Sequence, residues 1–141
     1  CGAADHGALV APSGVWASLS RAPGLVVVAI SDAGPVGVDV EAVGAACFPG
    51  FDDVALHPGE SADTTWERTQ VWVRKEAVLK ALGLGLRVDP RRLRVSIPRE
   101  QAAVLAWDDA DVAPSGRVRL DDVEVGSKYQ AAVAVIAPLP S

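Results

Sequence analysis

Two short stretches of the chain carry charged residues in patterns that could do chemistry. The first is VGVDVE, residues 36–41, in which one valine separates Asp39 from Glu41. Because successive side chains of a β-strand alternate between its faces, the two carboxylates project the same way, about 7 Å apart. That separation suits two oxygen ligands of one hard cation such as Mg²⁺. A strand with one solvated face would carry the same pair, so the spacing alone leaves both interpretations open.

The second stretch is VWVRKEAVLKALGLGL, residues 71–86, in which Lys75 and Glu76 interrupt a helical run of apolar residues. At about 100° per residue, Lys75 falls near the middle of an apolar stripe and Glu76 at its border. An ammonium on a core-facing stripe must either extend to solvent or meet an anion. Lys80 follows Glu76 by one turn, where a solvated pair would contribute about a few tenths of a kcal/mol. The apolar stripe consists of Val71, Trp72, Val78, Leu79 and Leu82.

Taken together, the two stretches supply three carboxylates and flanking lysines. These are the side chains needed for metal-assisted chemistry on a phosphate, because carboxylates hold the cation and a lysine neutralises phosphate oxygens. An anion bound beside the helix would account for both Lys75 and Glu76. The alternative is that the helix only packs and its charges are solvated.

Other elements must position these residues. LVVVAIS, residues 25–31, is typical of a buried strand, and we expect it to pair with residues 36–41 as an antiparallel hairpin across the turn DAGP. Further short strands are expected near LRVSI at Leu93, VLAW at Val104, RVRL at Arg117, VEV at Val123 and YQAAVAVIA at Tyr129.

The main helix is expected to run from about Thr65 to Leu82. Thr64 or Thr65 suits the N-cap, and Gly83 suits the C-terminal stop. A short helical turn is expected near residues 52–56. The order of strands, helix and strands predicts an α+β fold, with an antiparallel sheet packed on one long helix.

Composition bounds the class of protein. The chain has 141 residues, which fits one domain over residues 15–141 after an irregular segment at 1–14. The formal net charge is -5 and Lys/Arg residues form no dense run, which argues against nucleic acid or an anionic membrane as partner. No apolar run is long enough to span a bilayer. Two cysteines make no disulfide framework, so a cytoplasmic location is expected.

The beginning of the chain is unusual, because the sequence contains no methionine and starts at Cys1. We expect that residues preceded Cys1 and were removed or lie outside the numbering. A mature lipoprotein also begins with cysteine, but the rest of the chain favours a cytosolic protein.

The two stretches, in this order, resemble the paired signature of the 4′-phosphopantetheinyl transferase superfamily, of the surfactin-synthetase-activating type. That signature joins a (V/I)-G-(V/I)-D-x-E strand to a (W/F)-x-x-K-E-(A/S)-x-x-K helix. The similarity covers roughly residues 15–137. It implies Mg²⁺-dependent transfer of phosphopantetheine from coenzyme A to a serine of an apo acyl or peptidyl carrier protein, which leaves 3′,5′-ADP. Mn²⁺ could take the place of Mg²⁺.

The resemblance also implies roles for single residues. Asp39, Glu41 and Glu76 match the metal-binding acids, and Glu76 matches the residue proposed to activate the carrier serine. Lys80 matches the lysine that contacts the phosphate and assists the leaving group. Lys75 matches a second motif lysine close to coenzyme A.

Two departures from the family pattern matter. The family's N-(L/I)-S-H-S segment holds the 3′-phosphate of coenzyme A, and here it is SLSRA. Ser20 matches the serine, while Arg21 replaces the histidine and could bind phosphate through two N–H donors or be a solvated arginine. The numbered chain also holds at most about the last thirty residues of the N-terminal lobe found in two-lobed relatives. Two alternatives follow from the resemblance: an N-terminal part lies outside the numbering, or a compact variant self-associates and completes its site across a subunit interface. A coenzyme A or carrier-protein binding module with little turnover is the alternative function.

Overall fold

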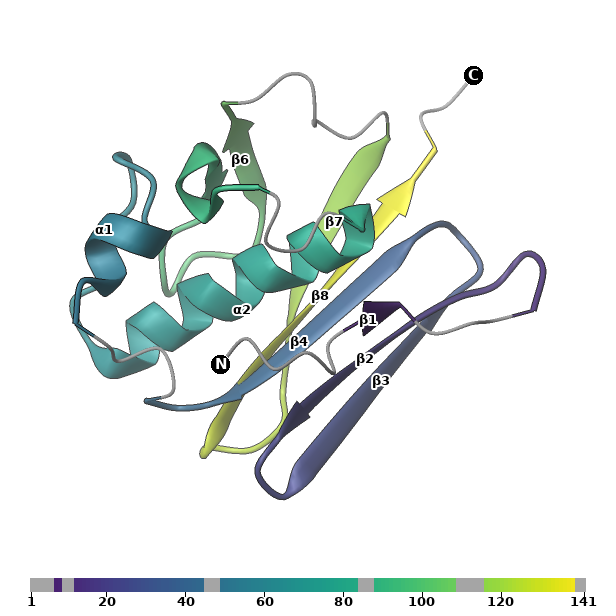
Figure 1. Ribbon diagram of the computed structural model, residues 1–141, viewed down its shortest axis with the longest axis horizontal. Coiled ribbons are helices and arrows are strands. Elements are labelled where there is room, and N and C mark those ends of the chain that lie inside the picture. Colours follow the sequence, from purple (N-terminus) through teal and green to yellow (C-terminus); the bar gives the residue numbers. More distant parts are fainter. Residues whose placement is uncertain (1–6, 9–11, 45–48, 84–87, 109–115, 139–141) are drawn as a thin grey trace.

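One long helix, α2 (Thr65–Leu82), crosses an antiparallel sheet in the computed structural model of the chain (Figure 1). The structure describes residues 7–8, 12–44, 49–83, 88–108 and 116–138. At the N-terminus of α2, the Thr64 side chain accepts from the Glu67 N–H, and the Glu67 carboxylate accepts from the Thr64 N–H. Gly83 ends the helix with φ 70°, in the left-handed region that favours glycine. The bounds and both caps confirm the sequence prediction.

The sheet beneath α2 is antiparallel and has the strand order β4-β8-β7. It consists of β4 (Val36–Ala42), β8 (Tyr129–Ala137) and β7 (Arg117–Val123). The two short strands expected near Arg117 and Val123 are thus one strand. An antiparallel sheet packed on one long helix confirms the predicted α+β fold.

The predicted pairing of residues 25–31 with 36–41 is wrong. The strand β3 (Leu25–Ser31) pairs with β2 (Trp16–Ala22), which the sequence reading did not identify, and β4 pairs with β8 instead. The reason is local: Gly24, with φ 79°, forms a tight turn that brings Ala22 directly opposite Leu25. This hairpin lies beside β4 in Figure 1.

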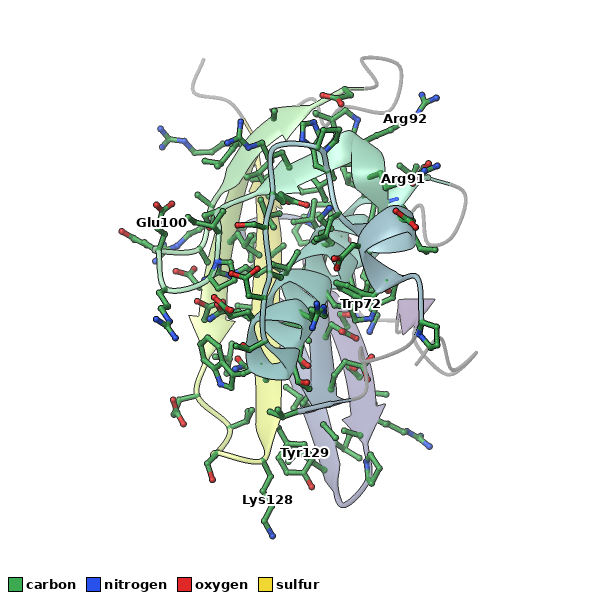
Figure 2. All side chains as sticks on the ribbon, turned by 90° about the vertical axis from the view of Figure 1, so that its left-hand side faces the viewer. Trp72, Arg91, Arg92, Glu100, Lys128 and Tyr129 are labelled. Atoms are coloured by element: carbon green, nitrogen blue, oxygen red, sulfur yellow. The ribbon has the colours of Figure 1, made fainter. Side chains whose placement is uncertain are left out.

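The prediction of an irregular segment over residues 1–14 is wrong at residues 7–8. Gly7–Ala8 form the short strand β1, which pairs antiparallel with β2. At the opposite end of the hairpin, the Tyr129 hydroxyl donates to the Pro23 carbonyl and fastens the turn to β8; Figure 2 shows Tyr129 at that end of the molecule.

Smaller elements cover the remaining sides of α2. They are α1 (Phe51–Ala55), the 3-10 helix η2 (Pro90–Arg92), β5 (Leu93–Val95) and β6 (Val104–Trp107). The strands β5 and β6 pair with each other, and α1 lies within one residue of the predicted helical turn. Among the helices that the structure describes, none combines the length and apolar character required to cross a membrane.

Burial of α2 is more extensive than a single apolar stripe. From Thr69 to Ala81, every side chain is buried except those of Glu76 and Lys80, which keep partial exposure. The main core packs apolar residues of α2 such as Val71 and Val78 against the alanines of β8, and each fully buried aliphatic side chain contributes about 1.5–3 kcal/mol. The predicted stripe was too narrow because α1, η2 and β5 cover sides of α2 that the sheet leaves open.

Candidate functional site

The face of β4 that carries the predicted acids lies directly under α2. A Cβ added at Gly37 would lie 2.1 Å from the Ala77 carbonyl oxygen, so only glycine allows the helix to come this close. Since side chains alternate along a strand, Asp39 and Glu41 share the face of Gly37 and point toward the helix. The sequence therefore brings β4 and α2 together where both motifs carry their charges.

Asp39 is fully buried at the seam between β4 and α2. Its Oδ1 atom accepts from the Ser20 hydroxyl at 3.2 Å and lies 3.3 Å from Lys80 Nζ. Lys80 also donates to the Val38 carbonyl at 2.8 Å. The predicted residues Ser20, Asp39 and Lys80 thus form one contact group, in which the ammonium faces the carboxylate.

Two serines of β2 hold the free edge of β4. The Ser18 hydroxyl accepts from the Val38 N–H and the Ser20 hydroxyl from the Val40 N–H, each at 3.1 Å. Both serines are buried. Through these hydrogen bonds the two serines satisfy backbone N–H groups of β4 and join β2 to it. The Ser20 hydroxyl also holds the Asp39 carboxylate. Ser20 therefore has its donor and one acceptor position engaged by the protein.

The three acids differ in exposure. Asp39 has no exposed surface and Glu41 is 6% exposed, whereas Glu76 on α2 keeps partial exposure. No three His, Cys, Asp or Glu side chains among the described residues converge closely enough to hold a metal ion as they stand. The donor set nevertheless fits Mg²⁺ in kind, since it offers hard carboxylate oxygens from two facing elements. Asp39, Glu41 and Glu76 are the residues that would hold the ion.

Lys75 lies in a different environment, although it directly precedes Glu76. It is fully buried, and its Nζ atom lies 2.6 Å from Glu60 Oε1, 2.6 Å from the Ala55 carbonyl and 2.9 Å from the Pro90 carbonyl. Burial lowers the pKa of Lys75, against the opposing effect of the Glu60 carboxylate. The anion that the sequence demanded for Lys75 is thus supplied by the protein.

The residue before Lys75 is also a buried cation. Arg74 places two nitrogens on the Asp122 carboxylate of β7, at 2.9 and 2.7 Å. It further donates to the carbonyls of Ser96 at 2.8 Å and Glu100 at 2.9 Å. A guanidinium held this way is a structural tie between α2, β7 and the loop after β5. Of the three consecutive residues Arg74, Lys75 and Glu76, only Glu76 keeps partial exposure to solvent.

Arg21 is not brought to the acids. It follows Ser20 on β2, so its side chain leaves the strand on the opposite face, where it is exposed and lies across from Val26. A contact with the 3′-phosphate of coenzyme A stays a prediction for this residue.

Sequence reasoning missed two residues of this region. Ser18 could have been found, because serines two residues apart on a strand point to the same side. Glu60 could not, because a glutamate in the turn HPGE looks solvated until the fold encloses it. Its carboxylate is in fact fully buried against Lys75.

Comparison with known proteins supports the resemblance. A family model described as ACPS, 4′-phosphopantetheinyl transferase superfamily, matches residues 35–134. Among solved structures, the chain is similar to the "Chronobacterium ammoniagenes ACPS-CoA complex", with 18% identity, coverage of 75% of this chain and 98% of that chain, and a TM-score of 0.50. At this identity the likeness shows the fold alone. No curated protein matches the chain. Because the matched range spans most of the chain and contains both β4 and α2, the chain belongs to the 4′-phosphopantetheinyl transferase superfamily.

Proposed function

We propose that this protein transfers the 4′-phosphopantetheine group of coenzyme A to a serine of an apo acyl or peptidyl carrier protein, giving holo carrier protein and 3′,5′-ADP. One observation carries the proposal. Within the buried middle of α2, the two side chains that keep partial exposure are Glu76 and Lys80, one helical turn apart, and Lys80 contacts Asp39 on the face of β4 that also carries Glu41. A helix that only packs requires neither a carboxylate nor an ammonium beside the buried Asp39.

The residues have distinct tasks in the proposed reaction. The serine oxygen attacks the phosphorus that carries pantetheine, the bond to the bridging oxygen of coenzyme A breaks, and 3′,5′-ADP leaves. Glu76 takes the serine proton, directly or through water. Lys80 meets the negative charge that develops on the leaving phosphate.

Magnesium is part of the proposal. When bound, Mg²⁺ supplies positive charge that offsets the diphosphate of coenzyme A. Asp39 and Glu41 would hold it together with Glu76, and Ser20 keeps the Asp39 carboxylate oriented through Oδ1. We expect Mn²⁺ to substitute, because it prefers the same oxygen ligands.

The direct test is the mass of an apo carrier protein after incubation with this protein, coenzyme A and Mg²⁺. The expected result is a gain of the phosphopantetheine mass on the native carrier, none on a carrier whose serine is replaced by alanine, and none with a chelator. If coenzyme A binds but no carrier gains mass, the protein is a binding module, and the proposed reaction is wrong.

The subfamily and setting are proposals as well. The motifs VGVDVE and WVRKEAVLK favour the surfactin-synthetase-activating type, which primes carrier proteins of peptide and polyketide synthases, and we expect the protein in the cytoplasm. Arg21 would give a preference for coenzyme A over dephospho-coenzyme A. Equal affinities for the two ligands would show that Arg21 makes no contact with the 3′-phosphate.

Self-association is supported by one surface. The outward face of β3 exposes Val26, Val28 and Ile30, with 56%, 51% and 72% of their surface accessible. Apolar side chains in a row on an edge strand are a suitable contact for a second copy. Sedimentation of wild type and of Ile30→Lys tests it: a monomeric wild type, or an oligomer that Ile30→Lys leaves intact, would rule this contact out.

A further inference from the structure

The Lys75–Glu60 pair is the most enclosed pair of charges that the structure describes. Both side chains are inaccessible to solvent, and 2.6 Å separates Nζ from Oε1. An ammonium has three N–H donors, and Lys75 directs them to Glu60 and to the carbonyls of Ala55 and Pro90. No donor remains for a phosphate unless one of these contacts breaks.

Glu60 completes the arrangement from the other side. Its Oε1 atom accepts from the His57 N–H at 2.7 Å, and its Oε2 atom accepts from the Val95 N–H at 2.7 Å. The turn itself is closed by a hydrogen bond from the Glu60 N–H to the His57 carbonyl at 2.8 Å. The pair therefore ties α2 to the turn at residues 57–60 and to β5, as well as to α1 and η2.

Among the elements joined by this pair, α1 contacts α2 at two places. It ends at Ala55, whose carbonyl accepts from Lys75, and its Phe51 ring meets Trp72 edge-on with 6.2 Å between centroids. Figure 2 shows Trp72 on the side of α2 that faces α1. Trp72 precedes Glu76 by one helical turn, so these two side chains are neighbours along the helix. Fixing α1 against α2 thereby fixes the surface beside Glu76.

We propose that Lys75 is a positioning residue that makes no contact with coenzyme A. Together with Glu60 it holds α1, the 57–60 turn and η2 against α2, and these elements shape the surface over which a carrier serine approaches Glu76. The kinetic part of this inference rests on the proposed function, whereas the geometric part does not. It replaces the role that the motif resemblance implied for Lys75. Lys80 is then the motif lysine that meets the phosphate.

Lysine acetylation of the native protein tests the geometric part, because the sequence contains three lysines, Lys75, Lys80 and Lys128. Exposed Lys128 should react fastest. Lys75 should react only on unfolding, at least about tenfold more slowly than Lys80, both with and without coenzyme A. Lys75 that reacts in the free protein and becomes protected by coenzyme A would overturn the proposal. Failure of coenzyme A to protect Lys80 would count instead against the proposed function.

Glu60→Gln tests the kinetic part without altering a motif residue. The variant removes the charge that Lys75 meets, and we expect KM for the carrier protein to rise about tenfold while the Kd of coenzyme A stays within about twofold. Glu124→Gln, the same change at an exposed position, should alter neither value. A Kd that rises in step with KM, or a KM that does not change, would contradict the proposal.

Discussion

Lys75 and Lys80 lie on the same helix and each faces a buried carboxylate, yet their surroundings differ. Lys75 has no exposed side-chain surface, and its partner Glu60 also binds two backbone N–H groups. Lys80 keeps 8% of its side chain exposed and shares Asp39 with Ser20 at the seam with β4. The first pair is enclosed by the protein, while the second lies beside Glu41 and Glu76. The difference shows that two motif lysines on one helix can divide into one enclosed by the protein and one that keeps solvent exposure beside the acids.

The largest expected effect comes from breaking the enclosed pair. Lys75→Met would leave the Glu60 carboxylate buried without its cation, which costs about 3–5 kcal/mol. Chemical denaturation of wild type and variant measures the loss. Lys80→Met should cost less, and added Mg²⁺ should restore part of its stability, because the cation binds the folded acids. A loss below about 1 kcal/mol for Lys75→Met would mean that the pair is solvated.

The next effect concerns the acid between the two lysines. Glu76→Gln removes the proposed base and one metal ligand, so transfer should fall by about 10³-fold, equivalent to about 4 kcal/mol. Its partial exposure means that unfolding stability should change by less than about 0.5 kcal/mol. Initial rates and denaturation curves measure the two quantities. Transfer near the wild-type rate would remove Glu76 from the mechanism.

A substitution at Gly37 disturbs the packing of α2 on β4 near Lys80 without touching Lys75. In Gly37→Ala the new methyl group would lie 2.1 Å from the Ala77 carbonyl oxygen and 2.8 Å from Lys80 Cβ. Overpacking of this kind costs about 2 kcal/mol, and α2 must move away from β4 where Lys80 meets Asp39. We expect lower stability and slower transfer with Lys75 still protected from acetylation. Unchanged stability would show that the close approach does not exist in solution.

The smallest effect lies at the start of α2, remote from both lysines. Desolvation raises the pKa of Glu67, but hydrogen bonds from Thr64 and Asp63 outweigh it and hold the pKa below its ordinary value of 4.5. A lowered pKa stabilises the fold fully above pH 4.5 and ceases to do so as pH falls through the folded-state value. Wild type should therefore exceed Glu67→Gln in Tm near neutral pH, with the gap closing in acid. A gap that persists at low pH would contradict the shift.

Sequence predicted those features whose causes are local. The bounds of α2 followed from Thr64 and Gly83, and the shared face of Asp39 and Glu41 followed from strand alternation. The predicted hairpin of residues 25–31 with 36–41 was wrong for two reasons. The tight turn at Gly24, a local cause that was overlooked, pairs β3 with β2, and β4 pairs with β8, far along the chain, which no turn pattern indicates. The two motifs therefore predicted the acids of the site, but they did not predict that Ser18 and Ser20 of β2 hold β4 and Asp39 in place.

Lys75 shows the same limit at one residue. The sequence indicated correctly that its charge must meet an anion, because a central position on an apolar helix forbids an unpaired ammonium. It could not indicate which anion, since Glu60 lies in a turn whose burial depends on α1, β5 and η2 together. The partner of Arg74 was equally unpredictable, because nothing in the local sequence connects Arg74 with Asp122 on β7.

We propose that coenzyme A binds at the seam of β4 and α2, on the side of Lys80 and not of Lys75. The Kd of coenzyme A with Mg²⁺, measured by calorimetry for wild type, Lys80→Met and Glu60→Gln, tests it most directly. A lost charged hydrogen bond to phosphate predicts that Lys80→Met weakens binding at least about tenfold, while Glu60→Gln stays within about twofold of wild type. An unchanged Kd for Lys80→Met, or an equal loss in Glu60→Gln, would contradict the claim.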